Sequence, residues 1–184
     1  MSLTPSNILE RGTLASDFTL LDTISEKIIS LQELKGERGT IIFFICNHCP
    51  FVIHINRELV QLAKDYTSRG FSFIAISSND AEKYPMDGPQ KMKIHATKEH
   101  YPFPYLYDET QEVAKAYNAA CTPDLYVFDG NLTSVYHGQL DDSRPGNDLP
   151  VTGIDIREVL DLLECEKPYR GIPKPSIGCN IKWK

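Results

Sequence analysis

The feature that most constrains the fold of this chain is a continuous apolar strand followed at once by a helix and a second apolar strand. Residues 40–45, Thr-Ile-Ile-Phe-Phe-Ile, are mostly β-branched and aromatic without alternation, which is typical of a strand covered on both faces. Apolar residues then recur at helical spacing over residues 52–66, and residues 71–77 again have the pattern of a buried strand. Residues 40–77 are therefore predicted to form one βαβ unit with parallel strands and a right-handed crossover.

Further short elements are predicted on both sides of this unit. Asp129-Gly130-Asn131 lies between two apolar runs and indicates a β-hairpin. The other predicted elements are strands near residues 17–20, 28–31 and 105–107 and helices near residues 90–99, 112–117 and 156–163. We expect residues 1–165 to form a single domain and residues 166–184 to form a tail packed on it.

The charge and hydropathy of the chain exclude several classes of partner. Its 19 Lys and Arg residues against 25 Asp and Glu residues give a net charge of −6. Without a basic excess, neither nucleic acid nor an anionic membrane is an expected partner. No run approaches the ~18 apolar residues of a membrane span. Residues 1–12 lack the basic start and apolar run of a secretory signal, so we expect a cytoplasmic location.

Two of the five cysteines lie in the segment that joins the first strand to the helix, Cys46-Asn47-His48-Cys49-Pro50. An odd number of cysteines in a chain expected to be cytoplasmic argues for reactive or metal-binding thiols rather than a disulfide framework. At a helix N-terminus, unpaired backbone N–H groups and the helix dipole favour a thiolate. We expect Cys46 to be the exposed nucleophile and Cys49, one turn into the helix, to be the resolving thiol.

Three other interpretations of this cysteine pair compete with redox chemistry. A structural disulfide that closes four residues would stabilise the fold by only about 2 kcal/mol, and a staple would span more of the chain. A zinc site could use Cys46, His48 and Cys49, but the adjacent His48 and Cys49 cannot readily both face one ion. Inert core cysteines are the third interpretation, and the intervening Asn47-His48 argues against it. Redox function is therefore the preferred interpretation.

His48 and Pro123 are two further candidate site residues. A protonated His48 would stabilise the Cys46 thiolate, whereas the alternative is a solvated loop histidine without an energetic role. Pro123 follows Thr122 just before an apolar run. Taken alone, it would be an ordinary trans proline at the start of a strand.

The order strand, Cys-x-x-Cys, helix, strand, Thr-Pro, hairpin and final helix resembles the thioredoxin fold. Residues 12–20 and 30–36 resemble its redoxin branch, the alkyl hydroperoxide reductase/thiol-specific antioxidant (AhpC/TSA) superfamily. Residues 46–50, 77–80 and 176–184 look like a bacterial subgroup described as thioredoxin-like or probable thiol-disulfide isomerases. The resemblance implies an α/β fold with a central mixed β-sheet flanked by helices, an N-terminal β extension and a C-terminal tail.

The resemblance also implies roles for individual residues. Cys46 and Cys49 would cycle between dithiol and disulfide, with a cis Pro123 against them. Thr122 and Pro123 would then offer a backbone edge with which an extended substrate segment can pair. Cys121, a less usual residue before Thr-Pro, is either a third redox thiol or simply buried. Cys179 either pairs transiently with an active-site cysteine or belongs to a tight packed turn.

Two positions depart from the family pattern. Family peroxidases carry Thr or Ser three residues before their attacking cysteine, where this chain has Phe43, so a peroxide oxygen would lack one polar partner. Thioredoxin carries a buried acid at the start of the strand before its cysteines, where this chain has Thr40. Proton transfer to and from Cys49 would therefore need another group or a water.

The resulting hypothesis is a thiol:disulfide oxidoreductase that acts on protein or small-molecule disulfides and needs no cofactor. Its expected reductant is a cellular thiol system such as thioredoxin with its reductase. The alternative is an antioxidant thiol peroxidase, in which Cys46 is oxidised to sulfenate and resolved by Cys49 or Cys179. A third, non-enzymatic hypothesis is a metal carrier that uses Cys46 and Cys49 with Cys121 or His48 as ligands.

Overall fold

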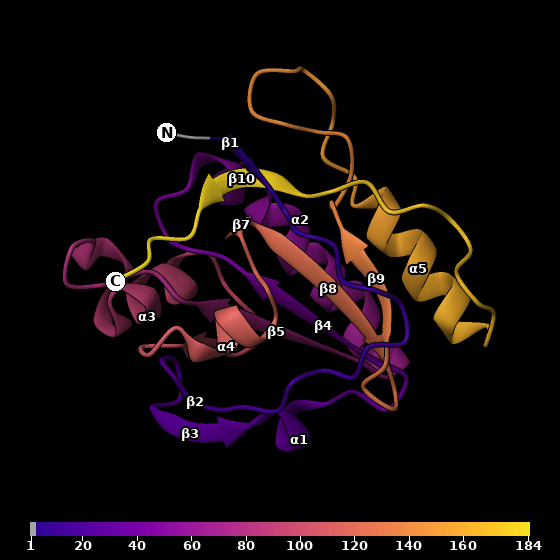
Figure 1. Ribbon diagram of the computed structural model, residues 1–184, viewed down its shortest axis with the longest axis horizontal. Coiled ribbons are helices and arrows are strands. Elements are labelled where there is room, and N and C mark those ends of the chain that lie inside the picture. Colours follow the sequence, from indigo (N-terminus) through magenta and orange to yellow (C-terminus); the bar gives the residue numbers. More distant parts are fainter. Residues whose placement is uncertain (1–2) are drawn as a thin grey trace.

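The centre of the molecule is a mixed β-sheet of seven strands (Figure 1), and the computed structural model describes residues 3–184. The strands of both sheets in the described residues are β1 (Leu3–Pro5), β2 (Thr19–Asp22), β3 (Lys27–Ser30), β4 (Gly39–Phe44), β5 (Phe71–Ser77), β6 (Tyr105–Tyr107), β7 (Cys121–Thr122), β8 (Asp124–Asp129), β9 (Ser134–Gly138) and β10 (Ile177–Asn180). The large sheet has the order β3-β2-β6-β5-β4-β8-β9, and a second sheet has the order β1-β10-β7. β5 pairs in parallel with β4 and β6, and the other neighbours are antiparallel, so the sheet is mixed as expected.

Helices cover both faces of the large sheet. They are α1 (Leu31–Leu34), α2 (Pro50–Tyr66), α3 (Pro89–Lys98), α4 (Glu112–Ala116) and α5 (Ile154–Glu164), with short 3-10 turns η1 (Thr67–Arg69) and η2 (Pro85–Asp87). α2, α3 and α5 contribute buried side chains to one apolar core, whereas α1 and α4 contribute to the other. The two cores explain why all six residues of β4 are buried.

The βαβ unit predicted from the sequence is present as β4, α2 and β5. β4 and β5 pair in parallel from Gly39 opposite Phe71 to Phe44 opposite Ile76. Alternate residues of β4 enter opposite cores, with Phe43 in one and Phe44 in the other. Burial on both faces therefore accounts for the unbroken apolar run, because neither face of the strand meets water.

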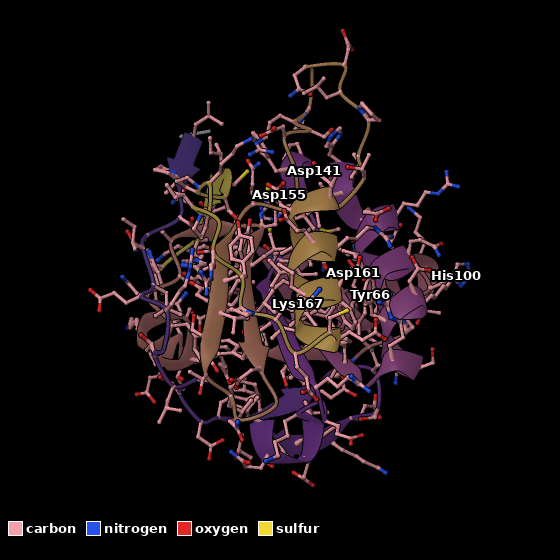
Figure 2. All side chains as sticks on the ribbon, turned by 90° about the vertical axis from the view of Figure 1, so that its right-hand side faces the viewer. Tyr66, His100, Asp141, Asp155, Asp161 and Lys167 are labelled. Carbon is pink, nitrogen blue, oxygen red and sulfur yellow. The ribbon has the colours of Figure 1, made fainter. Side chains whose placement is uncertain are left out.

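α5 lies beside α2 on one side of the sheet (Figure 2). At the C-terminal end of α2, the Tyr66 hydroxyl donates a hydrogen bond of 2.9 Å to Asp161 on α5. Figure 2 shows these two residues close together at the seam between the helices. The seam leaves the opposite end of α2, where the cysteine motif lies, free to meet other parts of the chain.

The C-terminal tail contains a strand that the sequence does not predict. β10 lies between β1 and β7, so a strand from near each end of the chain pairs beside the main sheet (Figure 1). After this strand, Ile181 is buried in the second core. The division into a domain of residues 1–165 and a tail of residues 166–184 stays a prediction. Within residues 3–184, no helix is long and apolar enough to cross a membrane.

Candidate active site

The cysteine motif joins the carboxyl end of β4 to the start of α2. β4 ends at Phe44, Cys46 follows two residues later, and Cys49 is the N-cap residue of α2. Pro50 occupies the first helical position, where its lack of an N–H costs no hydrogen bond. The placement of Cys49 one turn into the helix is therefore wrong, because the helix begins one residue after it.

Both cysteines of the motif are buried. Cys46 is 1% exposed and Cys49 is 0% exposed, so the expectation of an exposed nucleophile at position 46 is wrong. Residues of β7 and β10 lie directly against the two sulfurs. A strand–turn–helix motif places a thiol at a helix end, but the burial of that thiol depends on distant segments that pack over it.

Thr122 contacts both sulfurs through different atoms. The Cys46 Sγ lies 3.6 Å from the Thr122 hydroxyl oxygen, and the Cys49 thiol donates to the Thr122 carbonyl oxygen at 3.1 Å. The peptide bond between Thr122 and Pro123 is cis, as the resemblance implies. Thr122 and Pro123 thus lie at the cysteine pair, where the resemblance places them.

Cys179 approaches the motif from the opposite end of the chain. Its Sγ lies 3.0 Å from the Cys49 Sγ, and it pairs with Thr122 in the register of β10 and β7. Cys121 is also fully buried, but its sulfur contacts the Pro123 carbonyl oxygen at 3.5 Å, and its partner in β10 is Asn180. Of the two additional redox candidates, the structure therefore brings Cys179 to the cysteine pair.

The contacts within this sulfur cluster shift the pKa values of Cys46 and Cys49 in opposite directions. The pKa of Cys49 is lowered, first by a hydrogen bond from Cys46 and then by those from Cys179 and Thr122 and from the backbone of Val52. The pKa of Cys46 is raised by the same hydrogen bond to Cys49, by burial and by the nearby Asp87 carboxylate. In this closed arrangement the contacts favour ionisation of Cys49 over Cys46, and the role of Cys46 as the nucleophile stays a prediction.

A buried carboxylate, Asp87 in η2, is the functional candidate that the sequence analysis missed. It is 0% exposed and lies within 4.8 Å of the Cys46 sulfur. The backbone N–H of Asn47 and the side-chain amide of Asn79 donate to it at 3.0 and 2.8 Å. No sequence motif marks it, because Asp87 is a single acidic residue in the polar loop after β5.

His48 connects this carboxylate to the surface. Its Nδ1 lies 2.8 Å from Asp87 Oδ2, and its side chain is 35% exposed. The ring also stacks on Tyr84, with a centroid distance of 5.9 Å. His48 is therefore held by two neighbours and does not match the alternative of a solvated loop residue.

Cys46, His48 and Asp87 also offer three potential metal ligands, whose atoms all lie within 4.8 Å of one another. This set differs from the ligands expected from the sequence, because Asp87 replaces Cys49 and Cys121. Asp87 already accepts hydrogen bonds from Asn47 and Asn79. Any metal ion would therefore compete with existing partners of this carboxylate.

The two departures from the family pattern place no polar group at the sulfurs. The Phe43 side chain is fully buried and packs edge-on against Phe103, with ring centroids 5.1 Å apart. The Thr40 hydroxyl accepts a hydrogen bond of 3.0 Å from the Gly36 N–H, four residues earlier. Asp87, on a different element, is the buried acid that lies beside the motif instead.

Comparison with known proteins identifies the fold and the family. The AhpC/TSA family model matches residues 12–136. An uncharacterized conserved protein from Geobacillus kaustophilus is 56% identical, with a TM-score of 0.98 over 100% of this chain and 97% of that chain. A hypothetical protein from Sinorhizobium meliloti is 44% identical, with a TM-score of 0.96 over 98% of each chain. No curated protein matches the chain.

A more distant structure shows the same fold. The thioredoxin domain of a thiol-disulfide oxidoreductase from Bacteroides vulgatus is 17% identical, with a TM-score of 0.63 over 83% of this chain and 99% of that domain. The expected α/β thioredoxin-like fold is thereby confirmed. The family match spans both cysteines of the motif and the Thr-Pro segment. The chain belongs to the AhpC/TSA family.

Proposed function

We propose that this protein is a thiol:disulfide oxidoreductase whose redox couple is Cys46 and Cys49. The observation that supports this function is the position of Cys46 and Cys49 at the junction of β4 and α2, with Thr122 in contact with both sulfurs. Thiol–disulfide exchange requires a thiolate, and the shared proton lets one sulfur ionise while the other stays protonated. Membership of a redox family and the fold are consistent with this chemistry.

The reaction proceeds in two exchange steps. When a substrate disulfide reaches Cys46, the proton of that thiol passes to the Cys49 thiolate, and the Cys46 sulfur attacks the substrate. One substrate sulfur leaves as a thiolate and takes a proton from solvent. Cys49 then loses its proton and attacks the Cys46 sulfur of the mixed disulfide, which releases the second substrate thiol. The substrate gains two electrons, and the protein is left with a Cys46–Cys49 disulfide.

Asp87 and His48 provide the proton path in this proposal. Asp87 is buried within 4.8 Å of the Cys46 sulfur, and its hydrogen bond to His48 leads to a side chain that is partly exposed. A proton that leaves the sulfur pair can thus pass to the buried carboxylate and from there through the imidazole to solvent. This path supplies the proton-transfer group that the sequence leaves unassigned.

The proposed substrates are disulfides of proteins or small molecules, and the proposed reductant is a cellular thiol system such as thioredoxin with its reductase. The direction of electron flow depends on the reduction potential of the Cys46–Cys49 couple relative to this reductant. Equilibration of that couple with glutathione measures this potential. We keep a cytoplasmic location as part of the proposal.

The test is reduction of insulin disulfides by the reduced protein with dithiothreitol as the electron source. Cys46→Ser should abolish the reaction, and Cys49→Ser should accumulate a mixed disulfide that mass spectrometry detects at position 46. Cys165→Ser is the matched control, because Cys165 is an exposed thiol outside the site and its loss should leave the rate unchanged. Full activity of the Cys46→Ser protein would contradict the proposed function.

A thiol peroxidase is the second candidate. The observation that favours it is the Thr122 hydroxyl, which lies 3.6 Å from the Cys46 sulfur although the family position three residues before Cys46 holds phenylalanine. This hydroxyl could contact a peroxide oxygen that attacks the same sulfur. Titration of the reduced protein with hydrogen peroxide separates the two functions, since a peroxidase consumes one equivalent far faster than a free cysteine does.

A further inference from the structure

The C-terminal strand occupies the backbone edge next to the cysteine pair. β10 pairs antiparallel with β7, with Cys179 opposite Thr122 and Asn180 opposite Cys121, and Figure 1 shows β10 between β1 and β7. The edge of β7 is where an extended substrate segment was expected to pair. The chain therefore fills its own expected substrate position with a cysteine-containing strand.

Gly178 permits an unusually close approach of this strand. A Cβ atom at position 178 would lie 2.0 Å from the Thr122 carbonyl oxygen and 3.2 Å from Pro123 Cδ. Every other residue type carries a Cβ atom, so no other residue fits here unless the strand moves. The glycine thus sets the distance at which the neighbouring Cys179 meets the site.

The docked strand brings three sulfurs together, with Cys49 in the middle. Cys49 shares a hydrogen bond with Cys46 on one side, and its Sγ lies 3.0 Å from the Cys179 Sγ on the other. A disulfide bond is about 2.05 Å long, so Cys49 and Cys179 need to approach by only about 1 Å to form one. Cys49 is therefore placed to form a disulfide with either neighbour.

The tail is anchored on both sides of Cys179. Before it, the Ser176 hydroxyl donates to the Gly138 carbonyl oxygen at 2.8 Å. After it, the Lys182 N–H donates to the Asn79 side chain at 2.8 Å, and the Gln111 side chain donates to the Lys182 carbonyl oxygen at 2.9 Å. These hydrogen bonds hold Cys179 against Cys49 and β10 against β7, whose Thr122 contacts Cys46. Both motif thiols are buried, so a substrate needs this cover to move before it can reach them.

We propose that Cys179 is a third redox residue, which exchanges with the Cys46–Cys49 disulfide to form a Cys49–Cys179 disulfide that ties the tail across the site. The proposal rests on the oxidoreductase function, which first produces the Cys46–Cys49 disulfide. The Cys179 thiolate attacks the Cys49 sulfur, the bond between Cys46 and Cys49 breaks, and Cys46 leaves as a thiolate. The proton lost by Cys179 is balanced by the proton gained by Cys46, and the exchange consumes no further oxidant.

The exchange links the redox state of the protein to access to its site. In the reduced protein, β10 is held by noncovalent contacts and can leave β7 to admit a substrate. In the exchanged form, the covalent bond holds the tail in place and Cys46 is a thiol beneath it. Reduction of the Cys49–Cys179 bond by the thiol reductant is then required before the next substrate can enter. Cys179 would thus keep oxidised molecules closed until they are reduced.

Disulfide mapping of the full chain tests this proposal. The reduced protein is oxidised with diamide, which accepts two electrons and two protons, and is then alkylated with N-ethylmaleimide in denaturant and digested with trypsin. Cleavage places Cys46 and Cys49 together in peptide 39–57 and Cys179 in peptide 171–182. A Cys46–Cys49 bond stays within one peptide, whereas a Cys49–Cys179 bond joins the two.

We expect the joined peptides in the oxidised wild-type protein and in most molecules of the Cys46→Ser variant. Cys121→Ser is the matched control, because it removes a buried thiol of the same strand pair and should leave the joined peptides unchanged. Absence of the joined peptides from the oxidised wild-type protein would overturn the proposal, whatever the Cys46→Ser variant shows, because only the wild type can form the Cys46–Cys49 bond that exchanges. If the wild type still reduces insulin in that case, the oxidoreductase function survives. If it does not, both proposals fail.

Gly178→Ala tests the role of strand docking without changing a cysteine. The added methyl group should push β10 away from Thr122, which lowers the yield of joined peptides and speeds N-ethylmaleimide alkylation of peptide 39–57 in the reduced native protein. Circular dichroism establishes that the variant is folded. A folded variant with wild-type yield and wild-type alkylation rate would overturn the proposed dependence on the docked strand.

Discussion

Replacing Asp87 with asparagine should make the Cys46 thiol easier to ionise. The Asp87 carboxylate lies within 4.8 Å of the Cys46 sulfur, and its negative charge contributes to the raised pKa of that thiol. At 4.8 Å and an effective dielectric constant of about 20, two unit charges interact by about 3 kcal/mol, which corresponds to ~2 pKa units. Asparagine keeps the size of the side chain and removes the charge, so the pKa of Cys46 should fall by an amount of this order.

The assay is the pH dependence of iodoacetamide alkylation, read by mass spectrometry on peptide 39–57. A Cys49→Ser background leaves Cys46 as the only thiol in that peptide, so its midpoint can be compared with and without Asp87→Asn. Cys121 provides an internal control, because its raised pKa results from burial and from Asp124 rather than from Asp87. The midpoint for Cys46 should move down by about two pH units. An unchanged or higher midpoint would refute the electrostatic argument.

Three further predictions concern stability and binding. Ser30→Ala removes the capping box of α1 and should lower the free energy of unfolding in urea by about 1 kcal/mol, whereas no change would mean that this short helix is held by packing alone. Phe43→Ala empties a fully buried aromatic site and should cost about 3–5 kcal/mol in the same assay; a loss below 1 kcal/mol would contradict tight packing around Phe43. Asp87→Asn should also weaken any Zn²⁺ binding by the reduced protein in calorimetry, since Asp87 is one of three clustered ligands, and unchanged binding would place the ion elsewhere.

The elements that could be predicted from the sequence are those whose residue pattern lies within one short stretch of the chain. The apolar run of β4, the helical period of α2 and the second run of β5 each have a pattern that local burial requires, and the structure confirms all three. The hairpin of β8 and β9 was predicted in the same way, from a turn between two apolar runs. Such patterns can be recognised in the sequence because the backbone geometry of a helix or strand fixes which of its side chains share a face.

The candidate site could be predicted only in part. The motif and Thr122-Pro123 were found because they are recognisable as short segments, and the cis peptide bond agrees with the resemblance. Asp87 was missed because one acidic residue in a polar loop carries no pattern of its own. Its importance comes from the position of η2 beside the end of β4, which a reading along the chain does not contain.

The amino-acid sequence by itself determined the βαβ unit and the location of two cysteines at a strand–helix junction, since both depend on residues close together in the chain. Only the tertiary structure decided that these thiols are buried, that the pKa of Cys49 is lowered and that Cys179 touches Cys49 across 130 residues. The burial of the Cys46 and Cys49 thiols and their pKa values depend on which groups from distant parts of the chain exclude water from them and form hydrogen bonds with them. Those groups come from β7, β10 and η2, which meet the motif only when the whole chain has folded.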